Sequence, residues 1–97
     1  MSGIDELPAP SEAVEGAGFE VLRAFIVDGG LTVSLRRAFD DPEPWGILLV
    51  DLARHASRIY ARETEMSEEE ALSRIREMLL AEFDKPTDVG ATRSMAN

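Results

Sequence analysis

Two stretches of alternating apolar and polar residues flank an Asp-Gly-Gly turn, and this arrangement constrains the fold more than any other feature. The first stretch is EVLRAFIV at 20–27 and the second is LTVSLRR at 31–37, with Asp28, Gly29 and Gly30 between them. A type I′ turn requires positive φ at both central residues, which glycine tolerates. The pattern therefore predicts a β-hairpin with Asp28 and Gly29 at its tip.

The position of this turn sets the register of the hairpin. A two-residue turn pairs Ile26 with Leu31 and places all the apolar residues that alternate along the two strands on one face. These residues are Leu22, Ala24, Ile26, Leu31, Val33 and Leu35. A three-residue loop would shift one strand by one position and put Arg23 on this face, which argues against it.

A first helix is predicted after the proline-rich segment 40–44, where acidic residues complement the positive end of a helix and proline fits the first turn. Which residue caps the helix stays open, because Pro44 disfavours helical geometry at Glu43. The helix should reach Arg62 or Glu63, since its apolar residues follow the spacing of one buried stripe. The stripe comprises Trp45, Leu48, Leu49, Leu52, Ala56, Ile59 and Tyr60. Ile47 and Val50 are apolar outside the stripe, so the first half of this helix should be covered on two sides.

A second helix is predicted to begin after Ser67, because Ser67 and Glu70 have the spacing of a capping box. Lys85-Pro86 ends it. Its core-facing side comprises Ala71, Leu72, Ile75, Met78, Leu79, Glu82 and Phe83. The short link at 63–66 makes the two helices antiparallel neighbours. The expected fold is therefore α+β, a ββαα arrangement in which the hairpin packs against both helices.

Both ends of the chain look too polar and irregular to bury anything. Residues 1–18 and 86–97 are expected to be disordered tails around a single domain at 19–85. A core of this size gives only marginal stability unless a disulfide, a metal ion or self-association adds to it. The chain has no cysteine for a disulfide. Formation of a homodimer is the favoured source of added stability. A partner subunit would extend the two-stranded sheet or cover the apolar surface that the chain itself leaves exposed. The segment 4–14 could add a strand instead, although its prolines and acids weaken that alternative.

Charge narrows the range of partners. The net charge of −9 opposes binding to nucleic acid or to anionic membranes. No stretch resembles a signal peptide or a membrane span, so we expect a cytoplasmic protein. Residues 63–85 contain eight acids against three basic residues. This excess of acidic residues in one part of the chain either orients a second subunit or a basic partner as it binds, or forms a solvent-exposed helix face.

Candidates for chemistry are few. His55 is the only histidine and follows Asp51 by four residues, so Asp51 could orient its ring or join it on a metal. A catalytic metal site usually needs three protein ligands, and no second histidine or cysteine is present. We assign no catalytic, metal or cofactor residue and no cofactor. An enzyme is not favoured, and a surface or interface role for His55 is preferred.

Three arginines form a ladder along the first helix. Arg54, Arg58 and Arg62 recur at four-residue spacing, and unpaired like charges at that spacing are unfavourable. We expect acids of the second helix, such as Glu77 or Glu82, or acids of another subunit, to pair with them. An anion-binding role that includes His55 is the alternative, because guanidinium groups match phosphate and carboxylate oxygens.

Several segments together resemble a small family of uncharacterised alphaproteobacterial proteins. The resemblance spans about residues 19–88 and is carried by EVLRAFIVDGGLTVSLR, Phe-Asp-Asp-Pro at 39–42, Trp45-Gly46, LVDLARHA at 49–56 and Pro-Thr-Asp at 86–88. It implies a compact domain with no assigned activity, so it transfers no functional residue.

The role expected from the sequence is a non-enzymatic homodimeric interaction module that binds a protein partner. The candidate interface combines one hairpin face with the extra apolar pair of the first helix, and the arginines would form its charged rim. Its residues are Val21, Phe25, Val27, Ile47 and Val50. The competing class is a small-molecule or anion-binding protein that uses Arg54, His55, Arg58 and Arg62.

Overall fold

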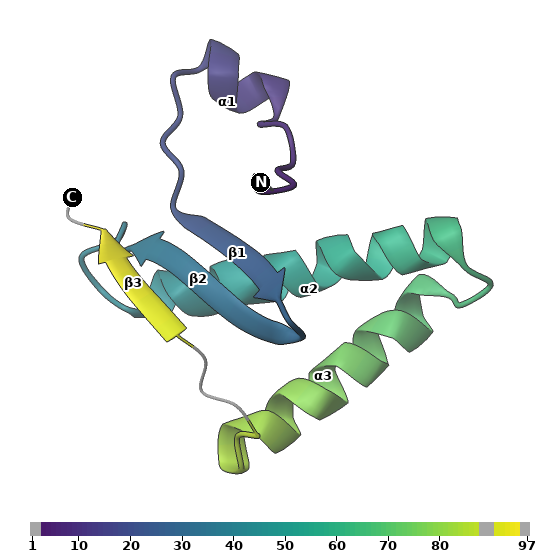
Figure 1. The fold of residues 1–97 in the computed structure, drawn as a ribbon. Coiled ribbons are helices and arrows are strands. Elements are labelled where there is room, and N and C mark those ends of the chain that lie inside the picture. The colour runs from purple at the N-terminus through teal and green to yellow at the C-terminus, as the bar shows by residue number, and fades with distance from the viewer. Residues whose placement is uncertain (1–2, 88–90, 96–97) are drawn as a thin grey trace.

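The computed structural model describes residues 3–87 and 91–95, which form a three-stranded sheet and three helices (Figure 1). In chain order the elements are α1 (Ser11–Glu15), β1 (Leu22–Val27), β2 (Gly30–Arg36), α2 (Glu43–Glu63), α3 (Glu68–Asp84) and β3 (Ala91–Met95). The α+β order of a hairpin followed by two helices is thus confirmed. Over the described residues, no helix is both long and apolar enough to cross a membrane.

The hairpin has the predicted turn and register. Asp28 and Gly29 have φ values of 51° and 81°, as the type I′ turn requires. Strands β1 and β2 are antiparallel, with Ile26 opposite Leu31 and Leu22 opposite Leu35. The alternating apolar residues therefore share one face of the sheet, as predicted.

The two ends of the chain differ from the sequence-based expectation of disordered tails. Residues 91–95 form β3, which pairs parallel with β2, so the sheet order is β1-β2-β3. Residues 11–15 form the short helix α1 rather than the alternative added strand. Local pattern could not show the C-terminal strand, because its partner β2 lies at the other end of the folded region.

The corner between β2 and α2 is held by the side chain of Trp45. Its indole Nε1 donates a hydrogen bond to the carbonyl oxygen of Arg37 at 2.9 Å. Its ring meets Phe39 edge to face, with centroids 5.8 Å apart. The residue between these two contact points, Ala38, has a φ of 65°. Trp45 therefore fixes the direction in which the chain enters α2.

Both long helices begin and end as the sequence indicates. Pro44 lies in the first turn of α2. Thr64 ends α2, its Oγ1 donating to Tyr60 O at 2.7 Å and accepting from Met66 N at 3.1 Å. Ser67 then caps α3 by accepting a hydrogen bond from Glu70 N at 3.0 Å. Side-chain hydrogen bonds thus hold the whole turn between the helices.

The helices α2 and α3 meet near their joining turn and diverge from it (Figure 1). Where they are close, Ser57 and Ala71 are fully covered, and such small residues let two helix backbones approach. The Ser57 hydroxyl donates to Ala53 O at 2.8 Å, so its burial leaves no polar atom unpaired.

The expected packing of both helices across the hairpin is looser than the sequence suggested. Among the described elements, no Cα of the sheet lies within 8 Å of a Cα of α2 or α3. In Figure 1 α2 runs behind the sheet and α3 lies below it. The apolar faces that the sequence assigns to one core are therefore only partly covered within this chain.

Candidate functional site

The polar side of α2 carries the predicted arginine ladder, which we call the arginine stripe (Arg54, Arg58 and Arg62). All three side chains are exposed. Arg58 Nε lies 3.6 Å from Glu68 Oε2 of α3, so the stripe does pair with an acid of the second helix. The partner is Glu68 and not Glu77 or Glu82. Glu82 Oε1 instead accepts hydrogen bonds from Thr87, from N at 2.9 Å and from Oγ1 at 3.1 Å.

His55 lies next to this stripe and contacts it. Its Nδ1 is 3.3 Å from Arg58 Nη1. A guanidinium has only donors, so His55 Nδ1 acts as the acceptor in this contact. The histidine and Glu68 together hold Arg58 near the turn between α2 and α3. Among residues 3–87 and 91–95 no group of three or more His, Asp or Glu side chains is placed to bind a metal.

A second feature is a set of exposed apolar side chains on several elements, which together we call the uncovered apolar surface. It extends over the hairpin tip, both faces of α2 and the C-terminal half of α3. Its members are Ile26, Val27, Leu31, Ile47, Leu49, Val50, Leu52, Ile59, Tyr60, Met78, Leu79, Leu80 and Phe83. Exposed apolar side chains in this number on a small chain are candidates for an interaction surface.

The five predicted interface residues fall into two groups, which the structure does not bring together. On α2, Ile47 and Val50 share one side of the helix, and Ile47 is 67% exposed. On the sheet, Val27 is exposed whereas Val21 and Phe25 are half-buried. β1 and α2 approach no closer than 8 Å between Cα atoms. The two groups are therefore separate parts of the surface.

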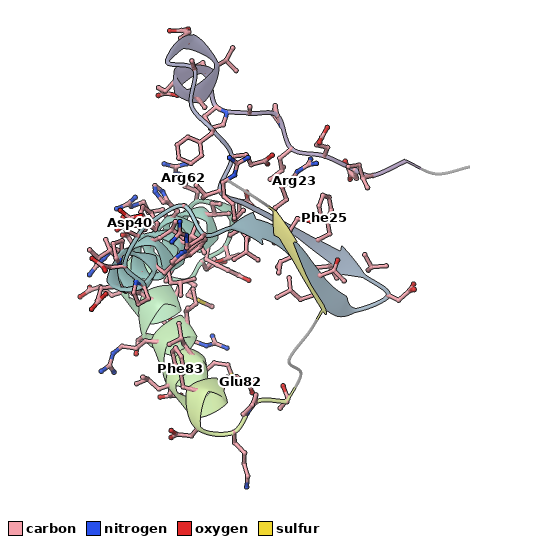
Figure 2. The ribbon with its side chains drawn as sticks, turned by 90° about the vertical axis from the view of Figure 1, so that its left-hand side faces the viewer. Arg23, Phe25, Asp40, Arg62, Glu82 and Phe83 are labelled. Atoms are coloured by element: carbon pink, nitrogen blue, oxygen red, sulfur yellow. The ribbon has the colours of Figure 1, made fainter. Side chains whose placement is uncertain are left out.

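Phe25 is less available than its position on the sheet suggested. The Arg23 guanidinium lies 5.3 Å from the centre of its ring, a cation-π contact. Arg23 also pairs with Glu20 at 3.2 Å and with Glu6 of the N-terminal segment. Figure 2 shows Arg23 and Phe25 on the side of the sheet that is turned away from α3. This side of the sheet is thus partly covered within the chain.

Two of the most exposed apolar residues were expected to be in the core. Ile26 at the hairpin tip is 73% exposed, and Phe83 near the end of α3 is 72% exposed. Their spacing indicates that each lies on a face to be buried, but spacing does not say whether the cover comes from the same chain. These residues were therefore missed as candidates for an interface.

Comparisons with known proteins identify relatives but no activity. A family model described as "Domain of unknown function (DUF5076)" matches residues 6–87. A solved structure from the photosynthetic bacterium Rhodopseudomonas palustrus CGA009 is 52% identical to this chain, with a TM-score of 0.77. The match covers 98% of this chain and 99% of that chain, which is provisionally described as a pyruvate dehydrogenase. No curated protein matches.

Proposed function

The chain belongs to the family of unknown function described as DUF5076, and from this premise we propose that it is a non-enzymatic homodimeric interaction module. In this proposal the second copy covers part of the uncovered apolar surface, and the resulting dimer binds a protein partner in the cytoplasm.

The accessible surface of the chain carries the proposal. A compact monomer of 10.7 kDa exposes about 5,500 Å² by the usual scaling of area with mass. This chain exposes 8536 Å², an excess of roughly 3,000 Å² over that scaling. Permanent homodimers bury about 1,000 to 2,500 Å² on each subunit. The excess is therefore large enough to contain a dimer interface, even though the extended N-terminal segment contributes to it.

The dimensions of the chain support the same conclusion. Its radius of gyration is 15.3 Å, whereas a compact domain of this length has about 12.5 Å. Among residues 3–87 only Ser57 and Ala71 are fully covered. Such a small core does not offset the conformational entropy of ordering the chain. Apolar burial between copies would supply the missing stability.

The arginine stripe and His55 favour an interaction role over catalysis. His55 is the side chain best suited to proton transfer near neutral pH, yet it is exposed and contacts Arg58. Arg58 also pairs with Glu68, and an anion bound there would compete with this carboxylate. The alternative of an anion-binding protein, built on Arg54, His55, Arg58 and Arg62, is therefore less favoured. The stripe is better suited to the charged rim of an interface.

Replacing Val50 by Glu tests the proposed dimer. Light scattering of the unchanged protein at micromolar concentration should give the mass of two chains. Val50→Glu should weaken the dimer at least 100-fold, because a carboxylate would be buried without a partner, at a cost of about 3 kcal/mol. Ser73→Glu is the matched control: it adds the same charge at an exposed position of a helix.

Each outcome of this experiment is informative. A mass of one chain for the unchanged protein would contradict the homodimer. If Val50→Glu keeps the mass of two chains, Val50 lies outside the interface. If Ser73→Glu dissociates the dimer equally, added negative charge rather than loss of the apolar contact is the cause.

A further inference from the structure

Two apolar faces of this chain have matching character, and neither packs on another described element. One is the hairpin face at its tip, where Ile26 is 73% and Leu31 is 48% exposed. The other is the C-terminal half of α3, where Leu79 is 37% and Phe83 is 72% exposed. A strand pair with one apolar face and an amphipathic helix normally pack on each other. Both faces therefore require a cover that the helices and strands of residues 3–87 do not supply.

The corner before α2 prevents the hairpin from closing onto its own helices. Trp45 Nε1 is bonded to Arg37 O, and Phe39 N donates to the same oxygen at 2.7 Å. The Phe39 ring packs on Trp45. Rotating the hairpin toward α3 would break these contacts, so the corner holds the hairpin in its observed direction.

The corner before α3 holds that helix away from the sheet in the same way. Thr64 and Ser67 bond the backbone on both sides of the turn. Arg58 and Glu68 add an ion pair between the helices next to it. Closing α3 onto the hairpin of the same chain would have to disrupt this second set of contacts too.

We propose that α3 of one copy packs across the hairpin face of a second copy, and that the second copy does the same in return. This inference rests on the proposed homodimer and names the contact that forms it. The arrangement is closed by a twofold axis, so each subunit gives one helix and receives one. Both unmatched faces, and a share of the roughly 3,000 Å² of excess surface, are covered at once.

The two faces of the hairpin allow a sharp control. Phe25 lies on the side of the sheet opposite to α3 (Figure 2). Successive side chains of a strand alternate between faces, so Val27 shares the face of Phe25 and Ile26 lies on the other. Val27 and Ile26 are both more than half exposed. They are thus neighbours of similar accessibility on opposite faces.

Disulfide cross-linking between copies tests the contact. The chain has no cysteine, so a disulfide between two introduced cysteines shows that these two positions lie close together. Ile26→Cys and Phe83→Cys are made in separate chains with different tags, coexpressed and oxidised in air. The yield of the 26–83 disulfide should be at least ten times the yield of the 27–83 disulfide, which the control pair of Val27→Cys and Phe83→Cys would form. Leu31→Cys with Leu79→Cys is a second pair on the same two faces, for use if the first variants misfold.

The mass of the unchanged protein separates failure of this inference from failure of the proposed dimer. A mass of two chains without an excess of the 26–83 or 31–79 disulfide overturns the reciprocal packing and leaves the homodimer standing. A mass of one chain overturns both. A third result, an internal disulfide in a dilute single chain that carries both Ile26→Cys and Phe83→Cys, would show that the chain closes on itself, which also overturns the inference.

Discussion

At the scale of single residues, Ala38 shows where this fold places backbone strain. Its φ of 65° lies in the left-handed region, which costs a residue with a Cβ about 1 to 2 kcal/mol. The hydrogen bonds from Trp45 and Phe39 to Arg37 O and the contact between the two rings hold it there. The strain thus lies at the corner that sets the direction of the hairpin relative to α2.

Replacing Ala38 by Gly should stabilise the protein by about 0.5 to 1 kcal/mol. Removal of the Cβ relieves the left-handed strain and outweighs the greater freedom of glycine in the unfolded chain. Urea unfolding at one fixed protein concentration measures the change. Ala81→Gly, in the last turn of α3, is the control and should destabilise by about 0.5 to 1 kcal/mol. Equal losses for both variants would show that Ala38 is not strained.

At the scale of the elements, the crossing of α2 and α3 depends on the small size of two residues. Ser57 and Ala71 are the covered residues of the crossing. The Ser57 hydroxyl bonds within its own helix, to Ala53 O, rather than across to α3. Its contribution to the crossing is therefore its volume rather than its polarity.

Ser57→Leu and Ser57→Ala should accordingly have different effects. The leucine overfills the crossing and should cost about 1 to 3 kcal/mol in free energy of unfolding. The alanine keeps the volume small and has the higher helix propensity, so the change should stay within about 0.5 kcal/mol. Urea unfolding of both variants at equal concentration decides the matter. A leucine variant as stable as the alanine variant would mean that the helices do not need to approach closely here.

The hairpin, both long helices and the Ser67 cap could be predicted from sequence because each depends on residues close together in the chain. The Asp28-Gly29 turn fixes the pairing of its own strands, and Ser67 caps the turn beside it. β3 could not be predicted, because a parallel pairing with β2 leaves no local pattern. The separation of the helices from the hairpin was missed for a related reason. The spacing of the apolar residues around Ile26 and Phe83 indicates a face to be buried, but it does not show which chain covers that face.

The exposure and contacts of the candidate residues were predictable to a similar extent. Ile47 and Val50 were predicted as interface residues because they are apolar outside the stripe of α2, and the structure exposes both side chains. Phe25 was predicted on the same grounds, but the Arg23 guanidinium over its ring could not be foreseen from alternation alone. The pairing of Arg58 with an acid of the second helix was foreseen, and the identity of Glu68 was not, because it depends on how the helices cross.

At the scale of the whole molecule, the proposed dimer makes stability depend on protein concentration. If unfolding separates two chains, each tenfold rise in protein concentration stabilises the folded dimer against unfolding by about 1.4 kcal/mol. For a unit of about 200 residues this should raise Tm by about 3 to 5 °C. Calorimetry between roughly 5 and 500 μM would measure it, with Val50→Glu expected to be much less sensitive. A Tm independent of concentration would contradict the dimer.

The pairing of β3 with β2 also bears on the order in which the chain folds. The hairpin and the pair of helices each join neighbouring segments, whereas β2 and β3 join across most of the chain. Contacts of such long range form slowly, since a large loop must close first. During synthesis the edge of β2 is therefore open until β3 emerges, and an open strand edge is a template for aggregation. A strand made long after β2 is thus the one that shields β2 from other nascent chains.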